Sequence, residues 1–297
     1  MTASAWWRRF GSRGVFWRQL LRFGILNCPL WLEPVAIAWW SMFFLLWSSG
    51  RRTVMRNLSA IKPGSLAVVN FFRCYRVFWN YAWTIADKVR FKESRVLPDW
   101  EFVGWKHFEE MQARGGAILL TAHMGSYDLG AHLFSETSGH SIVMVRAPED
   151  DPETRQFEET HSAEALRVEF TTNSTELAIG LLGAIREGHI VAIQGDRDRV
   201  TPGISDLPAT LFGKPVRLPA GPFALAMAAR VPIYPVFNVR LGRRRYRLVT
   251  REPIEIVRTA NREAACQEAV QVWARELETI VRTCWYQWFS FEPESAS

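Results

Sequence analysis

Ala117-Ile-Leu-Leu-Thr-Ala-His123-Met-Gly-Ser-Tyr-Asp128-Leu-Gly130 is the stretch that decides the fold of this 297-residue chain. An apolar run of strand length brings a histidine to its carboxyl end, and a glycine-containing turn then leads into a helical pattern. In open α/β sheets, ligands bind outside the carboxyl ends of the strands. The stretch therefore predicts a buried strand, a turn and a helix start, with His123 at the active edge of a sheet.

Short apolar runs alternate with helical stretches on both sides of this element. Such alternation predicts an α/β fold with a mixed, mostly parallel central sheet flanked by helices. The strands are expected at 117–121, 141–145, 168–171, 189–193 and 233–239. The helices between and after them are expected at 106–113, 126–137, 152–166, 174–187, 219–229 and 269–284, and residues 53–92 read as a helical lead-in.

The charge of the chain is unevenly distributed. Residues 1–86 hold 11 of the 36 Lys and Arg but only one acid, Glu33, and the remaining 25 basic residues face 29 acids. Nine of the 14 Trp also lie in 1–86, and Trp beside Arg is typical of protein surfaces that meet lipid headgroups. A nucleic-acid-binding arm is the competing interpretation, but such an arm would be polar, unlike the apolar run at 34–47.

That apolar run is too short for a simple membrane span. Val35–Trp47 covers 13 residues, whereas crossing the hydrocarbon takes roughly 20. Arginines precede and follow the run, which disfavours a one-way span and favours an interfacial or re-entrant anchor. The run also begins 34 residues in, which does not fit a cleaved signal peptide, so no export is expected.

These features suggest three parts of the chain. Residues 1–52 form a basic, Trp-rich membrane anchor of helical character, 53–291 form the catalytic domain, and 292–297 form a disordered tail. The four cysteines have no CxxC or Cys/His ligand spacing, so neither a disulfide framework nor a zinc site is indicated.

His123 and Asp128 are the candidate catalytic pair. Residues five apart on a regular helix point about 140° away from each other, so the two meet only if His123 lies in the turn before the helix. Asp128 can then accept a hydrogen bond from one imidazole nitrogen, and the other nitrogen can take a proton from a hydroxyl. The simpler alternative is a strand-end histidine and a first-turn acid that the helix dipole favours.

A second polar cluster follows the expected strand at 189–193. Asp196, Arg197 and Asp198 stand at the same edge of the predicted sheet, and Asp196 is the preferred functional member. Arg197, or Arg146 after another strand, can bind phosphate of a carrier or an acceptor. A solvated turn of alternating charges remains an alternative for this cluster.

The box around His123 is similar to the first motif of the glycerolipid and lysophospholipid acyltransferase superfamily. Its neighbours resemble the branch of late lipid A (lauroyl/myristoyl) acyltransferases, in ordered boxes from about residue 54 to 289. The resembling segments are Arg56-Asn57-Leu58, Gly104 to Gly116, Gln194 to Asp198, Leu211 to Val216, Leu218 to Pro222, Val231 to Val236 and Trp285 to Phe289. Asp128 stands where many members of this branch carry Glu, and Arg197 replaces the usual central residue of its box.

The resemblance implies an O-acyltransferase at the cytoplasmic face of a bacterial inner membrane. The donor would be an acyl thioester of acyl carrier protein or coenzyme A, and the acceptor a hydroxyl of a lipid A-like or other glycolipid. The resemblance implies that His123 and Asp128 are the catalytic pair. Arg146 stands where the family has an arginine soon after the second strand. The thioester is a co-substrate, no cofactor or metal is expected, and membrane lipids are expected partners.

The chemistry of such a transfer can be argued without the resemblance. A thioester is already activated, so proximity and one general base suffice. The oxyanion that develops needs donors, and the backbone N–H groups of Gly125 and Ser126 at the helix start are candidates. Gly213 and Arg217 can line the acyl or headgroup path, although a turn followed by a helix start explains the same residues.

Two other functions remain open. A metal-dependent glycosyltransferase can use Asp196-x-Asp198 to hold a divalent ion on a nucleotide sugar, but it leaves the His123 box unexplained. A non-catalytic membrane scaffold with the same fold is the second. Metal dependence and the effect of removing His123 distinguish the three.

Overall fold

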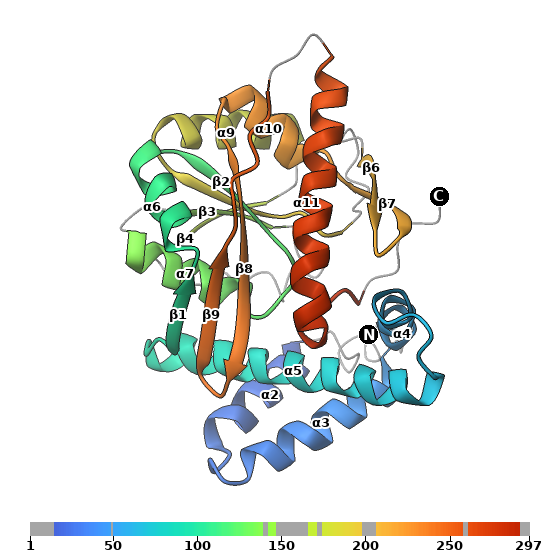
Figure 1. The fold of residues 1–297 in the computed structure, drawn as a ribbon. Helices are drawn as coiled ribbons and strands as arrows, with labels where there is room; N and C mark the ends of the chain where they lie inside the picture. The colour runs from blue at the N-terminus through green and yellow to red at the C-terminus, as the bar shows by residue number, and fades with distance from the viewer. Residues whose placement is uncertain are drawn as a thin grey trace, which may run out of the picture.

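The structure, a computed structural model, describes residues 15–48, 50–138, 142–146, 166–170, 174–197, 206–257 and 261–291. Within these ranges a central sheet has helices on both faces, and a further group of helices packs at one end of it (Figure 1). Residues 1–14 of the expected anchor, residues 152–165 of the expected helix at 152–166 and the expected tail at 292–297 lie outside the described residues.

Seven strands form the main sheet in the order β1-β9-β8-β2-β5-β3-β4, and β6 and β7 form a separate hairpin. The strands are β1 (Asp99–Val103), β2 (Ala117–Thr121), β3 (Ile142–Arg146), β4 (Leu166–Phe170), β5 (Ile190–Gln194), β6 (Asp206–Leu211), β7 (Lys214–Pro219), β8 (Ile233–Gly242) and β9 (Arg245–Thr250). The helices are α2 (Val15–Asn27), α3 (Glu33–Trp47), α4 (Gly50–Ile61), α5 (Ala67–Ser94), α6 (Trp105–Arg114), α7 (Tyr127–Ser138), α9 (Ser174–Arg186), α10 (Gly221–Ala229), α11 (Arg262–Cys284) and the 3-10 turn η1 (Trp285–Gln287).

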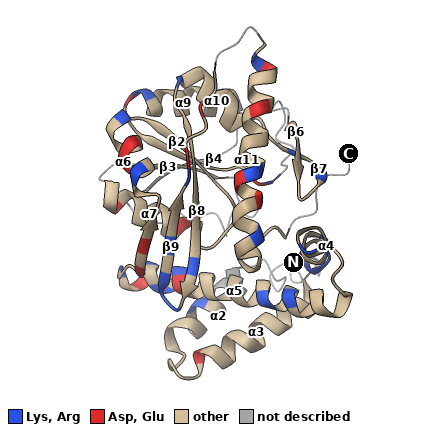
Figure 2. Cartoon of the chain, in the orientation of Figure 1, with Lys and Arg blue, Asp and Glu red and all other residues tan. Residues whose placement is uncertain are grey.

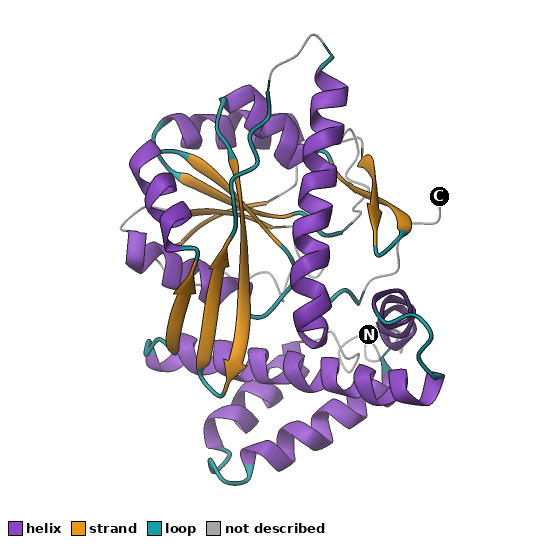
Figure 3. Cartoon of the chain, viewed as in Figure 1, coloured by secondary structure: helices purple, strands orange, loops and turns teal. Residues whose placement is uncertain are grey.

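The main sheet is mostly parallel, as expected. β2 pairs in parallel with β5 and β8, and β3 pairs in parallel with β5 and β4. β8 and β9 form the antiparallel pair, and β1 joins the edge parallel to β9. The prediction of a mixed, mostly parallel sheet is confirmed, and Figure 3 shows the helices packed around it.

The strand β2 explains why both faces of the sheet are covered. All five of its residues are buried. Ile118 and Leu120 belong to the core under α9, α10 and α11, whereas Ala117 and Leu119 belong to the core under α6 and α7. Side chains of a strand point alternately to opposite faces, so a run that is apolar throughout indicates a strand buried on both sides.

Four strands were not predicted from the sequence: β1, β6, β7 and β9. β9 begins at Arg245, the last of three consecutive arginines, and pairs with β8 across a turn in which Arg244 has a φ of 52°. β1 is short and partly exposed at the sheet edge. Residues 206–219 were interpreted in part as a turn and a helix start, but they form the hairpin β6–β7 around Phe212 and Gly213, both with positive φ.

Helices α2 to α5 form the group at one end of the sheet, and α3 in it is apolar on both sides. One side is buried, at Ile37, Ser41 and Leu45, and α3 packs on α5. The other side carries the large exposed side chains Val35, Trp39, Met42 and Leu46. Figure 2 shows α3 almost without charge along its length. Among the described residues, none of the helices combines the length and the hydropathy that crossing a bilayer requires.

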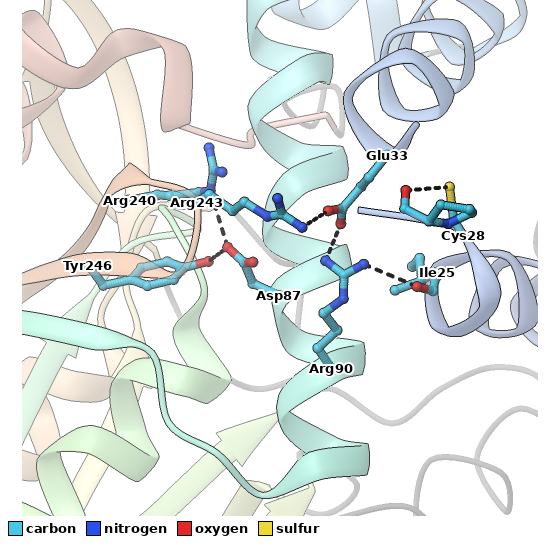
Figure 4. A network of polar contacts seen from close by, with 9 residues as sticks. Ile25, Cys28, Glu33, Asp87, Arg90, Arg240, Arg243 and Tyr246 are labelled. Carbon is cyan, nitrogen blue, oxygen red and sulfur yellow. Dashed lines mark hydrogen bonds and ion pairs between the residues drawn. The ribbon is translucent and has the colours of Figure 1, made fainter. Parts of the chain in front are cut away.

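Buried carboxylates join these helices to the sheet (Figure 4). Glu33, at the start of α3, is 3% exposed and forms ion pairs with Arg90 of α5 and Arg243 of the β8–β9 turn. Asp87 of α5 accepts from Arg240 of β8 at 3.2 Å and from the Tyr246 hydroxyl of β9 at 2.8 Å. Burial raises the pKa of Asp87, and the charge of Arg240 opposes that rise. These contacts fix the orientation of α3 and α5 relative to the sheet.

Replacing Glu33 by Gln is expected to loosen α3. The change removes the charge that two arginines share in a buried position, so the free energy of local opening should fall by about 2 kcal/mol. Hydrogen exchange of the α3 amides measures this opening. The matched control is Glu93→Gln, because Glu93 is half exposed and pairs with Arg22 at the surface; it should change exchange by less than about 0.5 kcal/mol. Equal exchange in both variants would contradict the role of Glu33.

Candidate active site

His123 and Asp196 meet because their strands are neighbours in register. Thr121, the last residue of β2, pairs with Gln194, the last residue of β5. His123 and Asp196 each follow two residues later, beyond the carboxyl ends of two parallel strands. The Nδ1 atom of His123 lies 2.7 Å from Oδ1 of Asp196. The expectation that both residues stand at one edge of the sheet agrees with this geometry.

The carboxylate of Asp196 is fully enclosed. Its side chain has no exposed surface, and its second oxygen, Oδ2, accepts hydrogen bonds from the backbone N–H of His123 at 3.0 Å and from the indole of Trp288 at 2.8 Å. Burial alone raises the pKa of Asp196, but the charge and hydrogen bond of His123, the guanidinium of Arg197 and the Trp288 hydrogen bond outweigh it and lower the pKa to about 2. Asp196 is therefore an ionised acceptor at neutral pH.

The pairing assigns a role to each imidazole nitrogen. Because an ionised carboxylate only accepts, Nδ1 of a neutral His123 carries the hydrogen and Nε2 has the lone pair. Asp196 thus holds the tautomer in which Nε2 can take a proton. The side chain of His123 is 20% exposed, so the ring is reached from outside while its carboxylate partner is not.

Asp128 was expected to accept a hydrogen bond from one imidazole nitrogen of His123, and at Nδ1 the partner is Asp196 instead. Asp128 lies in the first turn of α7 and forms an ion pair with Lys88 of α5. The reason is tertiary: the neighbouring strand β5 places a carboxylate beside the ring, whereas the carboxylate that follows in sequence is held by a cation from the N-terminal helices. A catalytic role for Asp128 stays a prediction.

The turn between β2 and α7 requires glycine. Gly125 has a φ of 55°, and a Cβ there would lie 2.0 Å from the carbonyl oxygen of Asn238. Its N–H donates to the carbonyl of Gln287 at 3.3 Å, so this proposed oxyanion donor already has an acceptor. Ser126 is buried, and its carbonyl accepts from Gly130 at 2.9 Å as the helix begins.

The remaining predicted residues divide into those near the pair and those elsewhere. Arg197 follows Asp196 and donates to the carbonyl of Phe289 at 2.7 Å. Gly213 lies in the β6–β7 turn, next to Phe212, whose ring is 5.9 Å from that of Trp288. Arg217 donates to the Asp206 carbonyl within the same hairpin at 2.6 Å. Arg146 ends β3, its side chain outside the described part, and Asp198 also lies outside the described residues.

Two residues of the site were not singled out from the sequence. Trp288 donates to Asp196, and Lys88 pairs with Asp128. The only signal for Trp288 was the aromatic run at the end of the resemblance, since its contact with Asp196 spans 92 residues. Nothing in the sequence indicated a role for Lys88, because its helix was predicted only as part of the helical region before the catalytic domain.

A histidine paired with a buried carboxylate at the carboxyl edge of a mostly parallel sheet is an arrangement that α/β enzymes use for acid–base chemistry. A family model described as bacterial lipid A biosynthesis acyltransferase matches residues 35–294. The chain belongs to this family, which confirms the resemblance and implies an acyltransferase. No curated protein matches the chain. Membership suggests association with a membrane.

Asp196→Asn is expected to remove an acid-sensitive part of the stability. The folded-state pKa of about 2 lies below the ordinary Asp pKa of 3.8. The stabilisation is therefore full above about pH 4 and is lost as the pH falls through 2. The gap in unfolding free energy between wild type and variant should narrow by about 2 kcal/mol between pH 4.5 and 2. Urea unfolding in detergent at several pH values measures it. A gap that is constant with pH would contradict the assignment.

Proposed function

We propose that the protein is an O-acyltransferase that moves a fatty acyl chain from an acyl thioester to a hydroxyl of a lipid A-like or related glycolipid. The observation that carries the proposal is the buried Asp196–His123 pair, which leaves Nε2 of the imidazole as the base. The family match supports the acyl chemistry. The resemblance supports the thioester donor, either acyl carrier protein or coenzyme A, and the glycolipid acceptor.

The transfer needs one base and close placement of two substrates. Nε2 of His123 takes the proton of the acceptor hydroxyl while its oxygen attacks the thioester carbonyl. The imidazolium that forms lies beside the Asp196 carboxylate, which stabilises it. When the tetrahedral intermediate collapses, the C–S bond breaks and the imidazolium returns the proton to the departing sulfur. The products are the ester and the free thiol of the carrier.

The oxyanion of the intermediate needs hydrogen-bond donors. Because Gly125 donates to Gln287, the first N–H groups of α7, beginning at Ser126, are the donors that we propose. The amino-terminal end of a helix has unsatisfied N–H groups and favours negative charge. We propose that Arg146 and Arg197 bind phosphate of the carrier or the acceptor.

The geometry favours acyl transfer over a metal-dependent glycosyltransferase. That rival needs Asp196 as a metal ligand, but both oxygens of Asp196 accept hydrogen bonds, from His123 and Trp288. Binding a divalent ion would require these N–H donors to be displaced. The rival also assigns no role to His123.

His123→Ala should lower acyl transfer by about a thousandfold, within the usual range for loss of a general base. The measurement is formation of acylated lipid A precursor by the purified protein, with acyl carrier protein and coenzyme A thioesters supplied separately. The control is His107→Ala, because His107 pairs with Glu110 on the outer helix α6. It should retain wild-type activity.

Three results would overturn the proposal. Loss of activity in EDTA together with a need for a nucleotide sugar would establish the glycosyltransferase. Unchanged cellular lipids after His123→Ala would favour the scaffold. If neither thioester donates an acyl chain to any glycolipid tested, the proposed classes of donor and acceptor are wrong. Mass spectrometry of lipids from cells with and without the protein identifies the acyl chain and the acceptor.

We also propose that α2 and α3 lie in the interface of a bacterial inner membrane, on its cytoplasmic face. The observation is the outer side of α3, where Trp39 and Trp47 are 70% and 76% exposed and stack on Phe43. Trp31, in the turn before α3, is 78% exposed. A 15-residue helix is about 22 Å long, shorter than the hydrocarbon core of roughly 30 Å. Such a helix suits the interface, where indole rings concentrate.

Replacing Trp31, Trp39 and Trp47 together by Ser should weaken binding to anionic vesicles by at least about a hundredfold, since burying one large apolar side chain is worth about 1.5–3 kcal/mol. Vesicle co-sedimentation measures it. Activity on detergent-dispersed substrates should persist, because these side chains point away from the core. Trp105→Ser on α6, half exposed, is the control and should bind normally. Unchanged binding of the triple variant would refute this surface.

A further inference from the structure

The C-terminal segment Gln287–Phe289 forms hydrogen bonds with both His123 and Asp196. The backbone N–H of Phe289 donates to the carbonyl of His123 at 2.7 Å, and Trp288 forms an antiparallel bridge with Met124. The side chain of Gln287, fully buried, both donates to and accepts from the backbone of Arg240 in β8 at 2.7 Å. The segment thus occupies the position of a further strand beside the catalytic turn.

Within this segment Trp288 makes a polar contact that packing alone does not explain. Its indole nitrogen lies 2.8 Å from Oδ2 of Asp196, and the side chain is 9% exposed. A carboxylate is a strong acceptor, so an N–H bond to it is stronger than one between neutral groups. The carboxylate has no exposed surface, so water does not replace a lost donor easily.

We propose that Trp288 is a positioning residue for acyl transfer, whose indole N–H holds Oδ2 of Asp196 so that Oδ1 stays on Nδ1 of His123. This inference rests on the proposed function. Oδ2 has two donors, the His123 backbone and the indole, and they approach from different segments of the chain. Together they define the plane of the carboxylate. Without the indole, the hydrogen bonds from Nδ1 and from the backbone N–H both come from His123, so the carboxylate can turn together with the residue that it should hold. A turned carboxylate no longer fixes the tautomer and direction of the imidazole.

The same segment also sets the position of the base itself. His123 lies between its backbone contact to Phe289 and its side-chain contact to Asp196. Trp288 and Phe289 therefore fix both members of the pair relative to each other, although neither touches a reacting atom. A small displacement of a base from its proton costs much of its effect.

The test is Trp288→Phe, which keeps an aromatic ring and removes the N–H. We expect kcat to fall by about ten- to a hundredfold, the range that a hydrogen bond to a charged group is worth, and KM to stay within about twofold. The matched control is Trp273→Phe. Trp273 is also buried and also loses one indole hydrogen bond, but to the carbonyl of Gly195, the residue before Asp196. It should cost stability with less than about a threefold change in kcat.

A double-mutant cycle tests whether Trp288 acts through Asp196. In an Asp196→Asn background, Trp288→Phe should cost less than about twofold in kcat, because the group it positions has already lost its charge. Equal losses in both backgrounds would show a separate structural role and overturn the proposal. So would a Trp288→Phe enzyme with wild-type kcat, or one whose loss lies wholly in KM.

NMR signals of the indole N–H groups test the contact independently of enzyme activity. In the protein labelled with 15N at tryptophan, the Trp288 signal is assigned by its absence in Trp288→Phe. A hydrogen bond to a carboxylate deshields the proton, so the signal should move upfield in Asp196→Asn, and the Trp273 signal should move much less. An unmoved Trp288 signal overturns the contact. If the signal moves but no acyl thioester is used, the positioning contact holds and the proposed function fails.

Discussion

The buried carboxylate of Asp196 is the constraint on which the site depends. It has no exposed surface, and three N–H groups converge on its two oxygens, two from His123 and one from Trp288. An ion in such a place is stable only when its acceptors are satisfied. That requirement fixes the ends of β2 and β5 and the C-terminal segment in one arrangement. The same arrangement leaves the lone pair of a neutral His123 on Nε2.

The mostly parallel sheet makes this arrangement possible. Parallel neighbours end at the same edge, so residues at equal distances beyond Thr121 and Gln194 come together. The turn at Gly125 then directs the chain into α7, and Asn238 of β8 leaves no room for a larger residue there. β2, the strand that precedes the site, is packed by apolar residues on both faces. The residues just beyond the ends of β2 and β5 are therefore placed by the fold and also form the His123–Asp196 pair.

The N-terminal helices are joined to the sheet by ion pairs. Glu33 and Asp87 bind arginines of β8 and the turn after it, so α3 and α5 are held to the sheet by buried ion pairs rather than by apolar contact alone. Removing one partner of a buried ion pair costs more stability than removing one partner of a surface pair. These ion pairs therefore hold α3, with its exposed apolar side chains, in a fixed orientation relative to the sheet edge that carries His123.

From the sequence alone, the apolar run of β2, the glycine turn and the helix after it were predictable, because neighbouring residues determine them. The sequence motifs, which occur in the same order as in a known family, also allowed the family to be predicted. The partner of His123 was not: Asp128 is five residues away, yet Asp196, 73 residues away, accepts the hydrogen bond at Nδ1. Trp288 and Lys88 were hidden for the same reason. Only tertiary structure decides such pairs, because strand register and helix docking bring together residues whose distance in sequence carries no signal.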